Sequence, residues 1–159
     1  MQKIVTHLWF ENHAEEAVNF YTSIFNNSKI LQMSYYDEAA SVPSGMPVGT
    51  VMSIDFMLEG QEFMALNGGP VFKFTPAISL VVNCETQEEV DKLWGKLTEG
   101  GAEVQCGWLT DKYGLSWQII PIILGKLLSD PDPIKAQRVM AAMLTMIKID
   151  IKGLMDAYE

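Results

Sequence analysis

The segment CGWLTDKYGLSWQIIP (residues 106–121) predicts a β-hairpin, because strand-like runs lie on both sides of a glycine-containing turn. In the second run, Trp117 and Ile119 alternate with Ser116 and Gln118. Successive side chains of a strand point to opposite faces, so this pattern predicts one apolar side and one polar side. We therefore expect the segment to close a sheet whose polar side can face a ligand.

The outline of this hairpin occurs earlier in the chain, where Gly60–Met64 (GQEFM) corresponds to Gly114–Gln118 (GLSWQ). A strand-like run and an apolar stripe at helical spacing precede each hairpin. Internal similarity of this kind indicates a duplicated structural unit. The expected strands are about 4–10, 29–36, 48–58 and 61–67 in the first copy, and about 78–82, 102–105, 107–112 and 115–121 in the second.

Each copy contains one predicted helix, which begins with a capping pair. Asn12 and Glu15 form the pair in the first copy, and Thr86 and Glu89 form it in the second. The two copies predict an α+β protein built from paired βαβββ modules. The expected organisation is a single domain with module 1 at about 1–70, module 2 at about 74–122 and a C-terminal helical extension at about 123–159.

The C-terminal extension carries another apolar stripe, and it suits packing in a core or in a dimer interface. Its methionines also suit an adaptable binding surface. Pro133 stands at a first helical position, and Asp150 can cap a last helical turn. The stripe consists of Ala136, Val139, Met140, Met143, Leu144 and Ile147.

Segment 37–47 contains two prolines and is expected to be a loop, which either covers a ligand or connects two strands.

Composition excludes several classes of protein. The chain of 159 residues has a net charge of −9, which disfavours binding to nucleic acid and to anionic membranes. Hydrophobic residues make up 48% and charged residues 19%, so a disordered chain is not expected. The strongest apolar run, about 119–124, is too short to span a bilayer, and the first residues lack the apolar run of a signal peptide. Two cysteines do not make a disulfide framework, so we expect a cytoplasmic protein.

Four segments together carry a resemblance to a known family: LWFENHAEEAVNFYTSIF, FMALNGGPVFKFTPAISLVVNCETQEEVDKLW, CGWLTDKYGLSWQIIP and RVMAAMLTMIKIDIKGLMDAYE. They are similar to the PhnB-like group, often labelled demethylubiquinone methyltransferase-like, of the vicinal oxygen chelate superfamily. That superfamily includes glyoxalase I, bleomycin-resistance proteins and extradiol dioxygenases. The resemblance implies a cup in which each module contributes a curled sheet, with ligands on the concave side and helices outside.

The resemblance also implies four metal-ligand positions in the chelating members, one on the first and one on the last strand of each module. In this sequence they fall on Val5, Met64, Ala77 and Gln118. Three of these side chains do not bind hard or borderline divalent cations, and a neutral glutamine is a weak replacement for a carboxylate. We therefore expect neither a bound metal nor a cofactor.

His7 lies one strand period from Val5, and Glu62 lies one strand period from Met64. A shifted metal site of His7, Glu62 and Gln118 is therefore the alternative. Cys106 would need a neighbouring base to act as a nucleophile, and an inert buried thiol is the other interpretation. Asn67 begins an Asn-Gly-Gly turn that either offers backbone amides to an anion or needs a positive φ. The predicted ligand-binding residues are His7, Trp9, Glu62, Met64, Asn67, Ser79, Cys106, Trp108, Ser116 and Gln118, and the face on which Trp108 lies is left open.

Three functions fit this sequence. The first, which we favour, is a metal-independent protein that binds a small apolar or aromatic compound in the cup. The second is a metal-dependent isomerase, lyase or dioxygenase with the shifted site. The third is the methyltransferase of the family label, although the first strand enters its helix without a glycine-rich cofactor loop. We expect a homodimer, since the superfamily often completes its cups across subunits.

Overall fold

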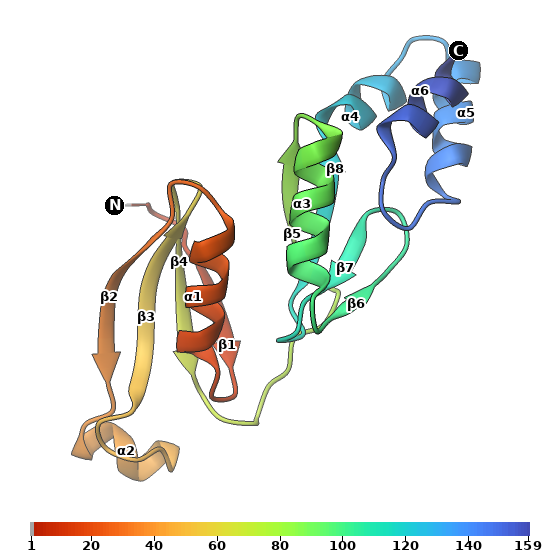
Figure 1. Cartoon of the computed structure of the whole chain (residues 1–159). Helices are drawn as coiled ribbons and strands as arrows, with labels where there is room; N and C mark the ends of the chain where they lie inside the picture. The colour runs from red at the N-terminus through yellow and green to blue at the C-terminus, as the bar shows by residue number, and fades with distance from the viewer. Residues whose placement is uncertain (1) are drawn as a thin grey trace. The chain divides into compact units, whose positions relative to one another are not determined.

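The computed structural model describes residues 2–159 and divides them into two compact units. Unit 1 ends at Phe74, and unit 2 runs from Thr75 to Glu159 (Figure 1). Each unit has its own sheet, its own helix packed on that sheet and its own core. This architecture confirms the predicted α+β class with paired βαβββ modules. The single-domain organisation and its module boundaries stay a prediction.

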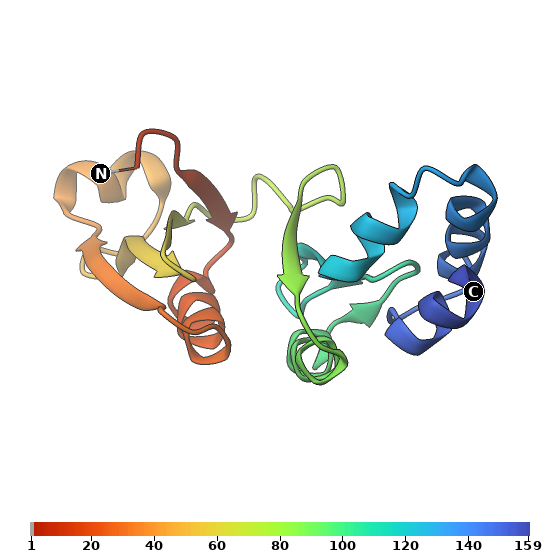
Figure 2. The ribbon, with the colours of Figure 1, turned by 90° about the horizontal axis from the view of Figure 1, so that it is seen from above.

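Unit 1 contains a four-stranded sheet in the order β1-β4-β3-β2. β1 pairs with β4 in parallel, whereas β4 pairs with β3 and β3 with β2 in antiparallel fashion. α1 packs on one side of the sheet and is seen end-on in Figure 2. The elements are β1 (Thr6–Phe10), α1 (Ala14–Ile24), β2 (Lys29–Tyr35), α2 (Glu38–Ser44), β3 (Val51–Leu58) and β4 (Gln61–Asn67).

The core of unit 1 lies between α1 and its sheet. Leu8 and Phe10 of β1 are buried there. Tyr21 of α1 is buried above the sheet, and Phe56 of β3 stacks on Phe63 of β4 with ring centroids 5.5 Å apart. Each such side chain contributes about 2 kcal/mol by leaving water, so burial decides which face of each strand meets the helix.

Unit 2 repeats this plan with a sheet in the order β5-β8-β7-β6. β5 pairs with β8 in parallel, and the other pairs are antiparallel. α3 packs on this sheet as α1 packs on the first, and Trp94 of α3 is buried. The elements are β5 (Ser79–Cys84), α3 (Gln87–Thr98), β6 (Ala102–Glu103), β7 (Trp108–Thr110) and β8 (Ser116–Pro121).

The capping pair predicted for α3 is confirmed. Thr86 is the N-cap residue, and its Oγ1 accepts a hydrogen bond from the backbone N–H of Glu89 at 3.2 Å. Glu89 in turn accepts from the backbone N–H of Glu85 through Oε2 at 2.8 Å. Two of the N–H groups at this helix entry are therefore satisfied locally.

The capping pair predicted for α1 is wrong. His13, not Asn12, is the N-cap residue, and it provides no side-chain cap. The Oδ1 of Asn67, at the end of β4, instead accepts a hydrogen bond from the backbone N–H of Ala14 at 2.9 Å. A residue 53 positions away in the sequence thus satisfies this helix end, which no local pattern can show.

The β7–β8 hairpin is held by a buried carboxylate. Asp111 is only 2% exposed, and its Oδ1 accepts hydrogen bonds from the backbone N–H groups of Tyr113 at 2.9 Å and Leu115 at 3.1 Å. Its Oδ2 accepts from the indole N–H of Trp117 at 2.9 Å. Three donors compensate the carboxylate for the loss of water, so Asp111 fixes the turn and the ring of Trp117 together.

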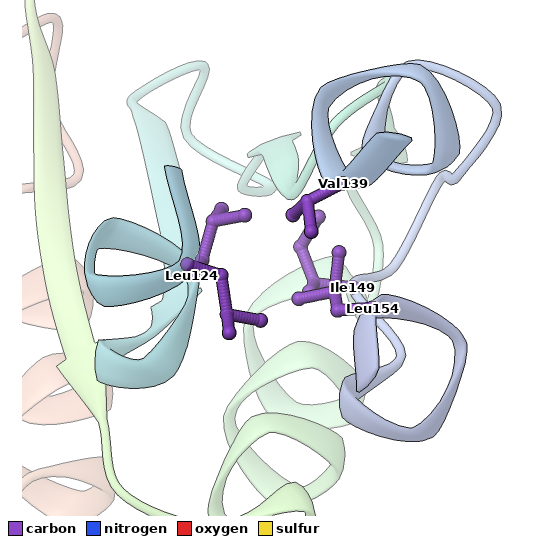
Figure 3. Close-up of a cluster of buried hydrophobic side chains, with 5 residues drawn as sticks. Leu124, Val139, Ile149 and Leu154 are labelled. Carbon is purple, nitrogen blue, oxygen red and sulfur yellow. The ribbon is translucent and has the colours of Figure 1, made fainter. Parts of the chain in front are cut away.

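Three helices follow β8 and form the C-terminal extension of unit 2. They are α4 (Ile122–Leu128), α5 (Pro133–Met143) and α6 (Ile151–Tyr158). Within residues 2–159, no helix combines the length and apolar character needed to span a lipid bilayer. Buried side chains from the three helices and the α5–α6 connection pack against one another (Figure 3): Leu124, Leu127, Val139, Ile149 and Leu154.

The predicted helical stripe is correct as far as Met143, where α5 ends, and wrong beyond it. Val139 is fully buried, and Pro133 occupies the first turn of α5 as predicted. Leu144 and Ile147, however, are 58% and 50% exposed because α5 ends at Met143. Asp150 caps α6 as predicted, and its Oδ1 accepts from the backbone N–H of residue 152.

The extension is attached to the rest of unit 2 by hydrogen bonds. The backbone N–H groups of Cys106 and Gly107 donate to the carbonyls of Met146 and Ile147, each at 2.8 Å. On the other side, the side chain of Gln87 in α3 donates to the carbonyl of Ile149 at 3.1 Å and accepts from the N–H of residue 151 at 2.8 Å. Segment 146–151 is thus bound on one side to the β6–β7 turn and on the other side to α3.

Segment 37–47, expected to be a loop, contains the short helix α2. The Oδ1 of Asp37 caps this helix by accepting from the backbone N–H of Ala40 at 2.8 Å. None of its residues is buried, and Pro43 lies inside it. A helix without a buried stripe leaves no apolar periodicity, which explains why the sequence pattern does not reveal it.

Replacing Gln87 with alanine should loosen the extension, because two backbone groups of the α5–α6 connection lose their partners. We expect the free energy of unfolding to fall by about 2 kcal/mol in urea titrations. Amide hydrogen exchange at residue 151 should accelerate. Gln137→Ala, which changes an exposed glutamine on α5, is the matched control and should change stability by less than about 0.5 kcal/mol. Equal effects of the two substitutions would contradict this attachment.

Candidate functional site

Each sheet has a second face, opposite the helix that packs on it, and we call it the far face. Directly paired strand residues share a face, so the register identifies its members. In unit 1 the far face comprises His7 and Trp9 of β1, Glu62, Met64 and Leu66 of β4, Val51, Ser53, Asp55 and Met57 of β3, and Lys29, Gln32, Ser34 and Tyr35 of β2. In unit 2 it comprises Ser79, Val81 and Asn83 of β5, Ser116, Gln118 and Ile120 of β8, Trp108 and Thr110 of β7, and Ala102 of β6.

A row of polar side chains crosses the far face of unit 1. His7 lies opposite Met64, Met64 opposite Asp55, and Asp55 opposite Gln32. Neighbouring strands are about 4.8 Å apart, so the thioether of Met64 lies between the imidazole and the carboxylate. The row combines a titratable ring, a soft sulfur and an acid on one surface.

The next row of unit 1 contains Trp9, whose ring is held by the segment after β4. The indole N–H donates to the carbonyl of Gly69 at 2.9 Å, and Phe72 meets the ring edge-on at 4.9 Å. A side chain at Gly68 would overlap the indole, since its Cβ would lie 2.3 Å from Trp9 Cε2. Trp9 therefore lies on the predicted face with its ring fixed against the chain and half-buried.

The far face of unit 2 brings together most of the predicted residues of that unit. Gln118 lies between Val81 and Trp108, and the register thereby places Trp108 on this face. The Nε2 of Gln118 donates a hydrogen bond to Oγ of Ser79 at 2.9 Å. Ser116 lies in the neighbouring row and is 2% exposed.

Two predicted site residues lie elsewhere. Asn67 is buried on the α1 side of its strand, where Oδ1 caps α1 and Nδ2 donates to the carbonyl of Val51 at 3.0 Å. Its backbone carbonyl accepts the hydroxyl of Tyr36, so its polar groups are engaged within unit 1. Cys106 lies in the β6–β7 turn at φ 59°, half-buried beside the extension.

The second thiol has no catalytic character. Cys84 is fully buried, and burial first, with the charge of Glu89 second, raises its pKa to about 12. A thiolate is the reactive form of cysteine, and at neutral pH this group stays protonated. Cys84 is thus a core residue at the end of β5.

The residues at the four metal-ligand positions do not fit a chelated divalent cation. Met64 and Gln118 lie on far faces. Val5 immediately precedes β1, and Ala77 lies shortly before β5. Together the four side chains offer one thioether and one amide. Among residues 2–159, no group of three or more His, Cys, Asp or Glu side chains is placed to hold an ion. The alternative set is divided, with His7 and Glu62 in unit 1 and Gln118 in unit 2.

Several far-face residues were not predicted from the sequence. Asp55 is one, and another is the hydroxyl pair of Ser34 and Ser53, whose Oγ atoms lie 2.6 Å apart. In VMSIDFML (residues 51–58), buried Ile54 and Phe56 alternate with these polar positions. The alternation that identified Gln118 would have identified Asp55 as well.

Comparison with known proteins places this arrangement in a family. The model of the 3-demethylubiquinone-9 3-methyltransferase family matches residues 2–120. A PhnB protein from Bacillus cereus, provisionally named as such a methyltransferase, is 46% identical with a TM-score of 0.68, and the match covers 76% of this chain and 99% of that one. Among proteins with curated functions, none matches the chain.

Two further solved structures show the fold alone. Protein PA1353 from Pseudomonas aeruginosa is 20% identical with a TM-score of 0.61, and the match covers 76% of this chain and 98% of that one. The fosfomycin resistance protein FosX from Listeria monocytogenes is 15% identical with a TM-score of 0.58, at 81% and 98% coverage. The family model ends at residue 120, so the extension of α4–α6 lies outside it.

Asn67→Ala should destabilise unit 1, because the first N–H of α1 and the carbonyl of Val51 would lose their partner in a buried place. We expect the free energy of unfolding to fall by about 2–3 kcal/mol, measured by urea denaturation. The matched control is Asn83→Ala, at an exposed position on β5, with an expected change below about 0.5 kcal/mol. A stable Asn67→Ala protein would contradict the structural role and restore this residue as a site candidate.

The two thiols should differ sharply in reactivity. At pH 8 a pKa of about 12 leaves only about one Cys84 in 10⁴ as thiolate, so iodoacetamide should not alkylate it in the folded protein. Peptide mass spectrometry should find the adduct on the half-buried Cys106 first. In urea both cysteines should react at similar rates. Preferential labelling of Cys84 in the folded state would contradict its burial.

Proposed function

The chain belongs to the 3-demethylubiquinone-9 3-methyltransferase family, the PhnB-like group of the vicinal oxygen chelate superfamily, and from this premise we propose that it binds a small apolar or aromatic compound without a metal. In each unit, the far face of the sheet is the surface that offers contacts to a ligand. One observation carries the proposal: the four positions that correspond to metal ligands in the chelating members of the superfamily hold Val5, Met64, Ala77 and Gln118, none of which has an imidazole, thiolate or carboxylate.

The chemistry of the donors supports this function over metal catalysis. A methionine thioether, a glutamine amide and two aliphatic side chains hold no hard or borderline cation. The shifted set of His7, Glu62 and Gln118 is the competing proposal, and it is favoured by the presence of an imidazole and a carboxylate on one far face. With that set, the protein would be an isomerase, lyase or dioxygenase.

A methyltransferase activity, as in the family's name, ranks third. The connection between β1 and α1 runs through residues 11–13 and contains no glycine. It therefore lacks the glycine-rich loop that binds a nucleotide cofactor between a strand and its helix. No feature of the far faces supplies a replacement for that loop. The name of the family therefore adds no support for this reaction.

We further propose that the protein is a cytoplasmic homodimer. Cys84 and Cys106 are both free thiols, which suits a reducing compartment. The C-terminal extension exposes large apolar side chains, among them Ile134 and Leu144, which a second subunit would cover.

Native mass spectrometry of freshly purified protein tests the proposed function. We expect a dimer at twice the 17.8 kDa mass of the chain, carrying a small organic molecule that denaturation releases. Elemental analysis before and after loading with Ni²⁺, Zn²⁺, Mn²⁺ and Fe²⁺ should find no stoichiometric metal. A stoichiometric ion that is lost on His7→Ala would overturn metal independence and favour the shifted site.

Calorimetry with S-adenosylmethionine is the control for the third function. If the proposed function is correct, S-adenosylmethionine does not bind to the protein at micromolar concentration. Binding in that range, abolished by substitutions on a far face, would establish a methyl-donor site and move methyl transfer ahead of the other two functions.

A further inference from the structure

The two far faces differ in electrical character. The far face of unit 1 carries His7, Lys29, Asp55 and Glu62. In unit 2, whose residues 75–159 are all described, the far face has no ionisable side chain among its members. The chain has a net charge of −9, so this neutrality is a local property of one surface.

The neighbouring carboxylates of unit 2 are directed to the other side of the sheet. Glu103 lies opposite Leu109, a buried residue, and its Oε1 accepts from the indole of Trp94 in α3 at 2.7 Å. Asp111 is buried and accepts three hydrogen bonds within the hairpin. The far face is therefore polar through amides and hydroxyls rather than through charges.

At its centre, Gln118 and Ser79 form a donor and acceptor pair. Because Nε2 of Gln118 donates to Oγ of Ser79 at 2.9 Å, the serine hydroxyl hydrogen and Oε1 of the glutamine stay available to a ligand. Both residues are half-buried, so the hydrogen bonds that they form are less weakened by water. Trp108 lies directly opposite Gln118 and offers a ring beside the pair.

The geometry points to a subsite for the uncharged, planar part of a ligand, one that carries a hydrogen-bond acceptor next to a donor, as a primary carboxamide does. This inference rests on the proposed function and specifies the ligand's chemical class. Ser79 donates to the ligand's carbonyl, Gln118 accepts from its N–H, and the ring of Trp108 packs against its plane. A charged group here would lose water without gaining a counter-ion, so ions are rejected.

Three planar compounds of nearly equal shape test this subsite: benzamide, benzoate and benzamidinium. With the full-length protein, we expect benzamide to bind at least tenfold more tightly than either ion in calorimetric or NMR titrations. Benzamide should shift the side-chain amide signals of Gln118, which Gln118→Leu identifies by their loss. The three affinities are measured on the unmodified protein, and a variant is used only to assign the Gln118 signals.

Substitutions then separate the two partners of the pair. Ser79→Ala and Gln118→Leu should each weaken benzamide binding about fivefold, the effect of one hydrogen bond. Gln118→Glu should reverse the preference toward benzamidinium. The matched controls, Ser129→Ala and Gln137→Leu, change exposed side chains of the extension and should leave binding unchanged. Thermal unfolding of each variant establishes that it is folded.

Benzoate binding as tight as benzamide, benzamide shifts confined to other residues, or no binding by all three compounds would each overturn the subsite. The proposed function fails separately. It is rejected by a stoichiometric metal, whereas a co-purified molecule that is charged, or that leaves the Gln118 signals unshifted, rejects only the subsite.

Discussion

The parallel pairing of the first strand with the last strand in each unit governs what both sheets present. β1 pairs with β4, and β5 pairs with β8, so a residue and its partner always share a face. A shift of one residue would move Trp117 and Ile119 out of the core and Gln118 into it. The free energy of burying those side chains therefore fixes the register, and the register fixes which polar groups a ligand can meet.

This dependence explains how much the sequence could predict. Alternation predicted that Trp117 and Ile119 lie on one side of their strand and Gln118 on the other, and the structure buries the first two, because burial is a local and periodic signal. The paired modules were found from internal similarity for the same reason. These conclusions need the sequence alone and no knowledge of which segments come into contact.

Other features depend on contacts between distant segments and could not be predicted. Asn67 resembled a loop residue near a ligand, but it caps α1, because β4 ends beside the start of that helix. Trp108 belongs to a short strand, and only its register with Gln118 assigns its face. α2 escaped prediction because it buries nothing.

The extension has a consequence for how this chain can change. In unit 2, two backbone N–H groups of the β6–β7 turn donate to carbonyls of segment 146–147, a region beyond the family's shared length. Ile120, at the end of a far-face row, also packs against the buried cluster of the added helices. A turn inside the part that the family model matches thus has hydrogen-bond partners outside that part, and a chain that ended after β8 would leave both N–H groups without these partners.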